Sequence, residues 1–152
     1  MINLKSIYDY SKRIIEANKH IGVNNFTKGD VYTVYNTGEN TFPAIHASLT
    51  ELEKDGSLFM YKFNMFYIDR LLENNSNEDE IIDSGYLALS QYLNCLENGF
   101  NEINSINLEK NSIYNVFVED FSDKCAGVWV EVSMSMCDKV GECTDVVVPF
   151  NV

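Results

Sequence analysis

The sequence is poor in the residues on which most enzymes and nucleic-acid-binding proteins depend. Its 152 residues include 2 histidines and 2 prolines, and Lys plus Arg total 11 against 23 for Asp plus Glu. The net charge of −12 argues against direct DNA or RNA binding, because each phosphate contact requires a Lys or Arg. Such a charge is typical of a surface that aids solubility, or of one that repels DNA or meets a basic partner.

Long apolar runs are also missing. No stretch approaches the roughly 20 apolar residues that a membrane-spanning helix requires, so we expect no membrane association. Residues 1–18 have charges spaced through them and lack the apolar core of a secretory signal. Hydrophobic residues make up 45% of the chain and charged residues 22%, close to the average for globular proteins. We therefore expect one domain over residues 1–152 that is made and folded in a cytoplasm.

The sequence contains no recognisable catalytic motif. His20 and His46 are too far apart in the sequence to indicate a metal site or a base next to a nucleophile. The glycines occur singly at breaks between elements, so no phosphate-binding loop is predicted. We expect both histidines to be structural or on the surface, and we predict neither a catalytic site nor a cofactor.

Three aspartates lie at the ends of predicted strands. Asp69, Asp120 and Asp123 are interpreted as carboxylates that bind backbone N–H groups or pair with the adjacent Arg70 and Lys124. The weakest alternative is a hydrolase that uses Asp69, Asp123 or Glu131, because no His, Cys or metal-binding pattern supports these carboxylates. We therefore predict that the protein is not an enzyme.

The cysteines do not have the spacing of a metal site. Structural zinc sites use paired ligands two to four residues apart, whereas the nearest pair here, Cys137 and Cys143, is separated by five residues and has no His nearby. In a reducing cytoplasm we expect all four cysteines to be thiols, with Cys95 on the apolar side of a helix and Cys125 beside the start of a strand. A Cys137–Cys143 disulfide across a turn is the alternative.

The first half of the chain alternates helix and strand patterns. Apolar residues at helical spacing predict a helix from Leu4 that ends near Asn18. Alternating residues then predict strands over Asp30–Tyr35, Ala44–Leu52 and Leu58–Ile68, and Asp55-Gly56 predicts a hairpin between the last two.

The second half is predicted to contain one long helix followed by two strands. Ser76, as the N-cap, begins a helix that continues to a stop at Asn98-Gly99. Strands are expected over Ile113–Val118 and Val128–Met136, with a turn and an inserted loop over 119–127. Residues 146–148 form one more short apolar run, which we expect to be able to exchange onto a neighbour.

Two features of the predicted strands indicate an interaction surface. Leu58–Ile68 has apolar residues on both faces, so we expect a central strand with helices on one side and a neighbouring layer or subunit on the other. Trp129 lies on the otherwise polar face of the last strand. It packs on a helix or loop, or it anchors an interface, where tryptophan is enriched.

The order of these segments resembles a family of phage proteins. The chain resembles small neck or tail proteins of tailed bacteriophages in four segments. They are Phe42-Pro43, the strand Tyr61–Arg70 (YKFNMFYIDR), the helix start Asn75–Ile81 and the segment Phe121–Trp129 before a long strand. The likeness covers residues 30–149 and is greatest to proteins of crAss-like phages, which are similar to the tail-terminator and head–tail connector group.

The resemblance implies a tail-terminator-like α+β subunit, with an antiparallel sheet flanked by two main helices. It also implies a homo-oligomeric ring in the neck or tail of the virion, assembled in the bacterial host cytoplasm. Other neck, portal and tail proteins are its expected partners, and DNA passes through its lumen without sequence-specific binding. The residues expected at the subunit interface are Phe42, Pro43, Asp69, Arg70 and Trp129. The alternative function is a small acidic adaptor that binds a basic protein.

Overall fold

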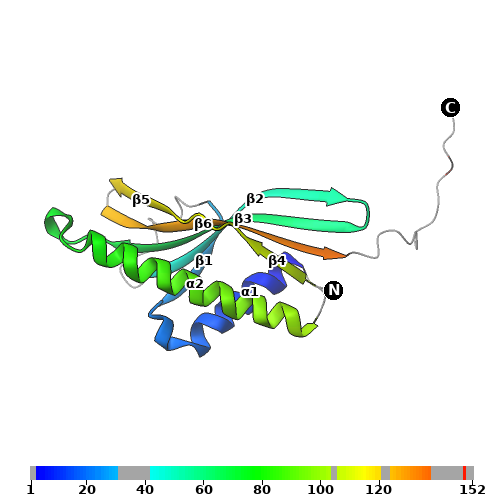
Figure 1. The fold of residues 1–152 in the computed structure, drawn as a ribbon, viewed down its shortest axis with the longest axis horizontal. Coiled ribbons are helices and arrows are strands. Elements are labelled where there is room, and N and C mark those ends of the chain that lie inside the picture. The colour runs from blue at the N-terminus through cyan, green and yellow to red at the C-terminus, as the bar shows by residue number, and fades with distance from the viewer. Residues whose placement is uncertain (1–2, 31–41, 104–105, 121–123, 138–148, 150–152) are drawn as a thin grey trace.

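The chain folds into a six-stranded sheet that carries two main helices on one face (Figure 1). The computed structural model describes residues 3–30, 42–103, 106–120, 124–137 and 149. The α+β class with two main helices is confirmed. The main core lies between the helices and the sheet, and its largest fully buried side chains include Tyr92, Phe63 and Met65.

The first helix, α1 (Leu4–Ala17), agrees with the prediction. The Asn3 side chain accepts the backbone N–H of Ser6 at 2.9 Å, which satisfies one of the unpaired donors at the helix start. Ile7, Ile14 and Ile15 form the buried stripe. A short 3-10 helix, η1 (Lys19–Ile21), and the strand β1 (Asn25–Lys28) follow, and neither was predicted. The predicted strand over Asp30–Tyr35 lies, apart from Asp30, outside the described residues.

The predicted hairpin is confirmed and is longer than expected. It joins β2 (Ala44–Asp55) to β3 (Leu58–Arg70) through a turn at Gly56, whose φ of 61° is a conformation that glycine adopts without strain. The pairing shifts between Leu49 and Glu51, so that Thr50 forms a bulge in β2.

The strand order is β1-β2-β3-β6-β4, and β5 also pairs with β6. The central position predicted for the strand at Leu58–Ile68 is therefore confirmed. The sheet is mixed rather than wholly antiparallel, because β1 pairs parallel to β2. A tight turn forces antiparallel pairing, whereas the long connection over residues 29–43 allows the chain to return in the same direction.

The second helix, α2 (Glu78–Ile103), differs from the prediction at both ends. Asn77, not Ser76, occupies the cap position, since its carbonyl accepts the N–H of Ile81 at 3.0 Å. The Asn77 side chain is bound to the backbone of Arg70 and Leu72, and the 3-10 helix η4 (Glu73–Asn75) lies between. Asn98-Gly99 does not end the helix.

Gly99 has a packing role that sequence alone does not indicate. A Cβ atom at this position would collide with the Tyr10 hydroxyl of α1, so glycine allows the two helices to approach. Gly85 allows α2 to approach the sheet in the same way, because a Cβ there would lie 2.6 Å from the ring of Tyr67 on β3. The close approach beside Gly85 is thus made by a side chain of the sheet.

Three strands complete the sheet. They are β4 (Ile106–Lys110), β5 (Asn115–Asp120) and β6 (Lys124–Cys137). β4 was not predicted. The predicted turn over 119–127 is wrong at both ends, because β5 continues to Asp120 and β6 begins at Lys124, and residues 121–123 lie outside the described residues. Gly127 lies inside β6, where a Cβ would collide with the carbonyl oxygen of Tyr67 on the neighbouring strand. The apolar run over 146–148 lies outside the described residues.

Candidate subunit interface

Phe42 and Arg70 meet on the face of the sheet that points away from the helices, called here the second face. The guanidinium carbon of Arg70 lies 5.2 Å from the centre of the Phe42 ring. Phe42 is buried with Ala44, Ile68 and Cys125 in a small apolar cluster separate from the main core. The described chain thus covers one end of the second face itself. At this end, β3 has the apolar residues that were expected on both of its faces.

Trp129 belongs to an aromatic cluster on the same face. Phe66 is the centre of this cluster, which consists of His46, Phe66, Phe117 and Trp129. The Phe66 ring centre lies 6.0 Å from that of Trp129, 5.9 Å from that of Phe117 and 6.2 Å from that of His46. Trp129 is only half-buried. Its ring contact is with a neighbouring strand rather than with a helix or loop, and its role in an interface stays a prediction.

His46 is the buried polar member of the aromatic cluster. Its Nδ1 lies 2.7 Å from the Thr27 hydroxyl and its Nε2 lies 3.0 Å from the Gly29 carbonyl. Because the carbonyl only accepts, the neutral ring donates from Nε2 and accepts the Thr27 hydroxyl at Nδ1. Burial lowers the pKa of His46, against the opposing effects of Gly29 and Asp30. The ring therefore holds β1 to β2, which agrees with the predicted structural role.

Asp69 and Pro43 lie apart from the aromatic cluster. Asp69 follows Tyr67 on the helix-covered side of β3, where both line a hollow of about 130 Å3 with Glu80 of α2. Its carboxylate accepts the backbone N–H of Arg70 at 2.8 Å, as predicted for a strand-end aspartate. Burial raises the pKa of the Asp69 carboxyl, opposed by the Arg70 N–H and charge. The carbonyl of Pro43 accepts the N–H of Asn24 at 2.9 Å.

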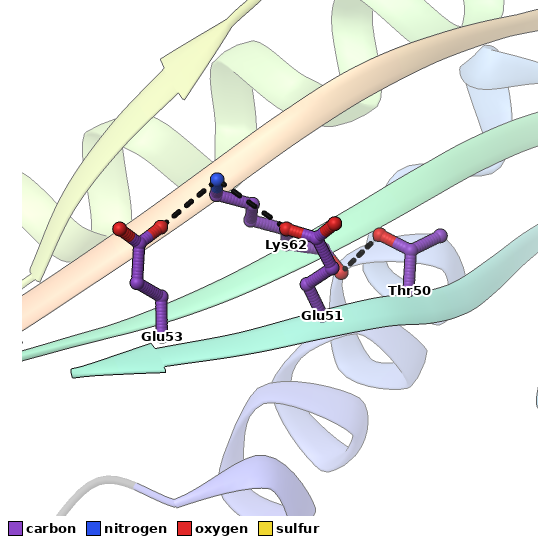
Figure 2. Close-up of polar contacts among 4 residues, drawn as sticks. All are labelled: Thr50, Glu51, Glu53 and Lys62. Atoms are coloured by element: carbon purple, nitrogen blue, oxygen red, sulfur yellow. Dashed lines mark hydrogen bonds and ion pairs between the residues drawn. The ribbon is translucent and has the colours of Figure 1, made fainter.

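The far end of the second face is polar. Lys62 of β3 forms ion pairs with Glu53 at 2.9 Å and Glu51 at 3.5 Å, and its carbonyl accepts the Thr50 hydroxyl at 3.0 Å (Figure 2). The hydrogen bond and charge of Glu53 raise the pKa of Lys62. Thr50, Glu51 and Lys62 line a hollow of about 360 Å3 together with Glu131.

Of the carboxylates considered for a hydrolase, the two that the structure describes, Asp69 and Glu131, do not come together. Register places Glu131 opposite Asn64 on the second face, whereas Asp69 is opposite Ala126 on the helix-covered face. Asp123 and the Asp120 side chain lie outside the described residues. Within the ranges that the structure describes, no three His, Cys, Asp or Glu side chains gather in a way that could hold a metal ion.

The cysteine prediction is confirmed where it is tested. Cys95 and Cys125 are thiols, with Cys95 packed against the main core and Cys125 buried near the start of β6. The Cys137 side chain and Cys143 lie outside the described residues, as does the alternative disulfide between them. In the described part of the chain, neither α1 nor α2 is both long and apolar enough to cross a membrane.

Sequence reasoning missed an exposed apolar edge. On the helix side of β5, Val116 and Val118 are 55% and 44% exposed, and Tyr86 of α2 is 55% exposed. Tyr86 and Tyr114 pack edge to face at 4.8 Å, and the Ser90 hydroxyl donates to that of Tyr114 at 3.2 Å. We call this surface the β5–α2 patch, consisting of Tyr86, Tyr114, Val116 and Val118.

The patch and the aromatic cluster meet in β5. Phe117 lies between the two exposed valines and points to the second face, where it contacts Phe66. Within the described ranges β5 pairs only with β6, so its other edge has no strand beside it. The sequence signal was the uncharged run Val116-Phe117-Val118, which has apolar side chains on both faces of a short strand.

Comparison with protein-family models finds no match to this chain, and comparison with curated proteins finds none either.

Proposed function

We propose that the protein is a structural subunit that assembles into a homo-oligomeric ring in the neck or tail of a tailed bacteriophage, as a tail terminator or head–tail connector. The observation that carries the proposal is the apolar β5 edge, with the β5–α2 patch on one side and Phe117 of the aromatic cluster on the other. An exposed apolar patch of this kind on an otherwise acidic chain marks a protein–protein contact.

A comparison with β2 supports this interpretation. Beyond its pairing with β1, the outer half of β2 carries the charged residues Glu51, Glu53 and Lys54, which protect an exposed strand from pairing with other chains. In β5, Glu119 and Asp120 place charge only at the end of the strand, and residues 115–118 carry none. We expect this uncharged part of the edge to be covered in the functional state, and a neighbouring subunit provides such a cover.

The phage location rests on the resemblance of Phe42-Pro43, Tyr61–Arg70 and Phe121–Trp129 to neck and tail proteins. A ring around DNA requires no catalysis and no cofactor. It requires two complementary surfaces per subunit and a lumen to which phosphate does not adhere, and the net charge of −12 suits such a lumen. The proposed site of action is therefore the virion, with portal, neck and tail proteins as neighbours.

The test is the oligomeric state of the purified protein. Light scattering coupled to size exclusion, with negative-stain microscopy, is expected to show closed rings whose population increases with concentration. The double variant Val116→Asp/Val118→Asp should abolish assembly and leave the circular dichroism spectrum unchanged. Leu52→Asp serves as the control, since Leu52 is 68% exposed on the hairpin and away from β5.

A strict monomer at every concentration, together with absence of the protein from purified particles, would overturn the proposal. Acidic residues flank the β5–α2 patch. If such a monomer bound a basic protein through this patch, the adaptor function would replace the ring as the proposed function.

A further inference from the structure

The uncharged edge of β5 matches, in its chemistry, one run of the chain outside the described residues. In β5, Val116 and Val118 are exposed on the helix side and Phe117 lies on the second face. Residues 146–148 are three valines, which in an extended strand also place apolar side chains on both faces. A strand of this composition beside β5 would therefore extend the β5–α2 patch on one face and the aromatic cluster on the other.

The charges beside the two segments indicate the direction in which they pair. Glu119 and Asp120 lie at the end of β5, whereas residues 146–152 carry no charge. The carboxylate nearest to the run is Asp145, which precedes it. Two strands that run in the same direction place Asp145 beside Asn115, at the uncharged start of β5, whereas the opposite direction would bring like charges together. Parallel pairing is therefore expected.

Pro149 determines which side of such a strand can pair. Proline has no backbone N–H, so it is tolerated in a strand where its nitrogen faces away from the neighbouring strand. The backbone groups of successive residues alternate in direction along a strand. Val147 therefore shares the outward direction of Pro149, and Val146 and Val148 direct their N–H and carbonyl groups to β5.

The chain after β6 is too short to cover the β5 edge of its own subunit in this register. β6 ends at Cys137, and Val116 pairs with Val128, nine residues earlier in β6. That length of strand measures about 30 Å, and the outer side of β5 lies two strand spacings, about 10 Å, from β6. The nine residues from Cys137 to Val146 span about 30–32 Å when fully extended, which leaves none to reverse direction and to pass β4. A neighbouring subunit has no such limit, because its Cys137 can lie close to the β5 edge.

We propose that residues 146–148 of a second copy of this chain add a strand to the β5 edge, parallel to β5. The inference rests on the proposed ring function and identifies the two halves of its subunit contact, with the β5 edge as the acceptor and residues 146–148 as the donor. Strand addition pairs the backbone groups of the edge, and the donated valines cover Val116 and Val118. Donor and acceptor are different surfaces, so the contact is heterologous and can continue from subunit to subunit until a ring closes.

The first test compares two proline substitutions one residue apart. Val148→Pro removes an N–H that the donated strand directs to β5, whereas Val147→Pro, the matched control, removes one that faces outward. By light scattering coupled to size exclusion, Val148→Pro is expected to assemble about tenfold more weakly than the wild type, and Val147→Pro about as strongly as the wild type. Circular dichroism and the melting temperature of both monomers should match the wild type, because the donated strand belongs to the fold of a neighbour.

The second test mixes two defective variants. Val148→Pro retains the acceptor and lacks the donor, whereas Val116→Asp/Val118→Asp retains the donor and lacks the acceptor. An equimolar mixture has one intact contact, so it should form a dimer with one copy of each variant and no ring. Addition of Val148→Pro to the second variant removes both halves and should abolish this dimer. If the aspartate variant does not fold, Val116→Ser/Val118→Ser replaces it, with a smaller loss of assembly expected.

The outcomes separate this inference from the function on which it rests. A wild type that never assembles contradicts the ring and this inference with it. Rings formed equally by both proline variants contradict only the donated strand, and assign the β5 edge to another segment, such as residues 31–35, or to another surface. Equal losses in both proline variants, or no dimer in the mixture, also contradict the donated strand. A lower melting temperature of the Val148→Pro monomer would place residues 146–148 in the fold of their own subunit and overturn the exchange.

Discussion

The two faces of the sheet are built from the same strands but are buried to different extents. On the helix-covered face, Phe63 is 1% exposed and packs in the main core. Three residues along the same strand, Phe66 is half-buried on the second face. There it packs against the small apolar cluster that contains Phe42, and its ring contacts are with His46, Phe117 and Trp129. The covered face therefore supplies most of the stability, whereas the second face and the β5 edge carry the contact that we propose with a neighbouring subunit.

The largest expected effect compares these two phenylalanines. Phe63→Ala should lower the free energy of unfolding by about 3–5 kcal/mol, because it leaves a cavity in the main core. Phe66→Ala should cost about 1–2 kcal/mol, because part of its ring is already in solvent. Urea denaturation of both variants measures the difference. Equal losses would show that the second face contributes to the core as strongly as the first.

A somewhat smaller effect is expected at Gly127, where the backbone of β6 leaves no room for a side chain. Gly127→Ala should destabilise the protein by about 3 kcal/mol, since the new methyl group would collide with the Tyr67 carbonyl that belongs to the β3–β6 ladder. Ser133→Ala, on the same face of β6, is the matched control and should change stability by less than about 0.5 kcal/mol. A neutral Gly127→Ala would mean that the strands can separate there.

Trp129→Ala tests whether the second face takes part in assembly. Its half-buried ring should contribute about 1–2 kcal/mol to the stability of the monomer, less than the 3–5 kcal/mol or so of a fully buried aromatic residue. The same change should weaken ring formation measurably by light scattering at a fixed concentration. Unchanged assembly would restrict the interface to β5 and α2, and a large loss of stability would show that Trp129 belongs to the fold.

The smallest expected effect is a pH dependence from His46. The unfolded chain binds a proton at this residue near pH 6.5, whereas burial lowers its pKa in the folded protein. The contribution of the neutral His46 ring to the stability is therefore fully present above about pH 6.5 and is lost as the pH falls below that value. His46→Gln should remove this part of the pH dependence, and His20→Gln, at an exposed position, should retain it. Thermal melts between pH 7 and pH 5 that are identical for wild type and His46→Gln would contradict the assignment.

Local sequence patterns were sufficient where an element is held together by its own neighbours. Helical spacing predicted α1, and the Asp55-Gly56 turn predicted the hairpin of β2 and β3. The prediction was less accurate where the role of a residue depends on a contact with a residue far away in the sequence. Gly99 indicates a helix stop when read locally, but in the structure it leaves room for Tyr10. Gly127 indicates a turn when read locally, but it lies in a strand against Tyr67.

The candidate interface divides in the same way. The sequence indicated that Phe42, Arg70 and Trp129 belong to a surface, and the fold gathers them on one face, but it places Asp69 on the other, since neighbouring residues of a strand point to opposite sides. Nothing local showed that β5 is an edge or that β1 runs parallel to β2, because strand order is set by pairing between distant segments.

The amino-acid sequence by itself determined the helical and alternating periods and the hairpin turn, because each depends on residues a few positions apart. Only the tertiary structure decided which aromatic residues are buried, which strand has an unpaired edge within the described ranges, and that Tyr86 of α2 packs against Tyr114 beside β5. These depend on which surfaces the packing of helices on the sheet removes from water, and that is a property of the whole chain.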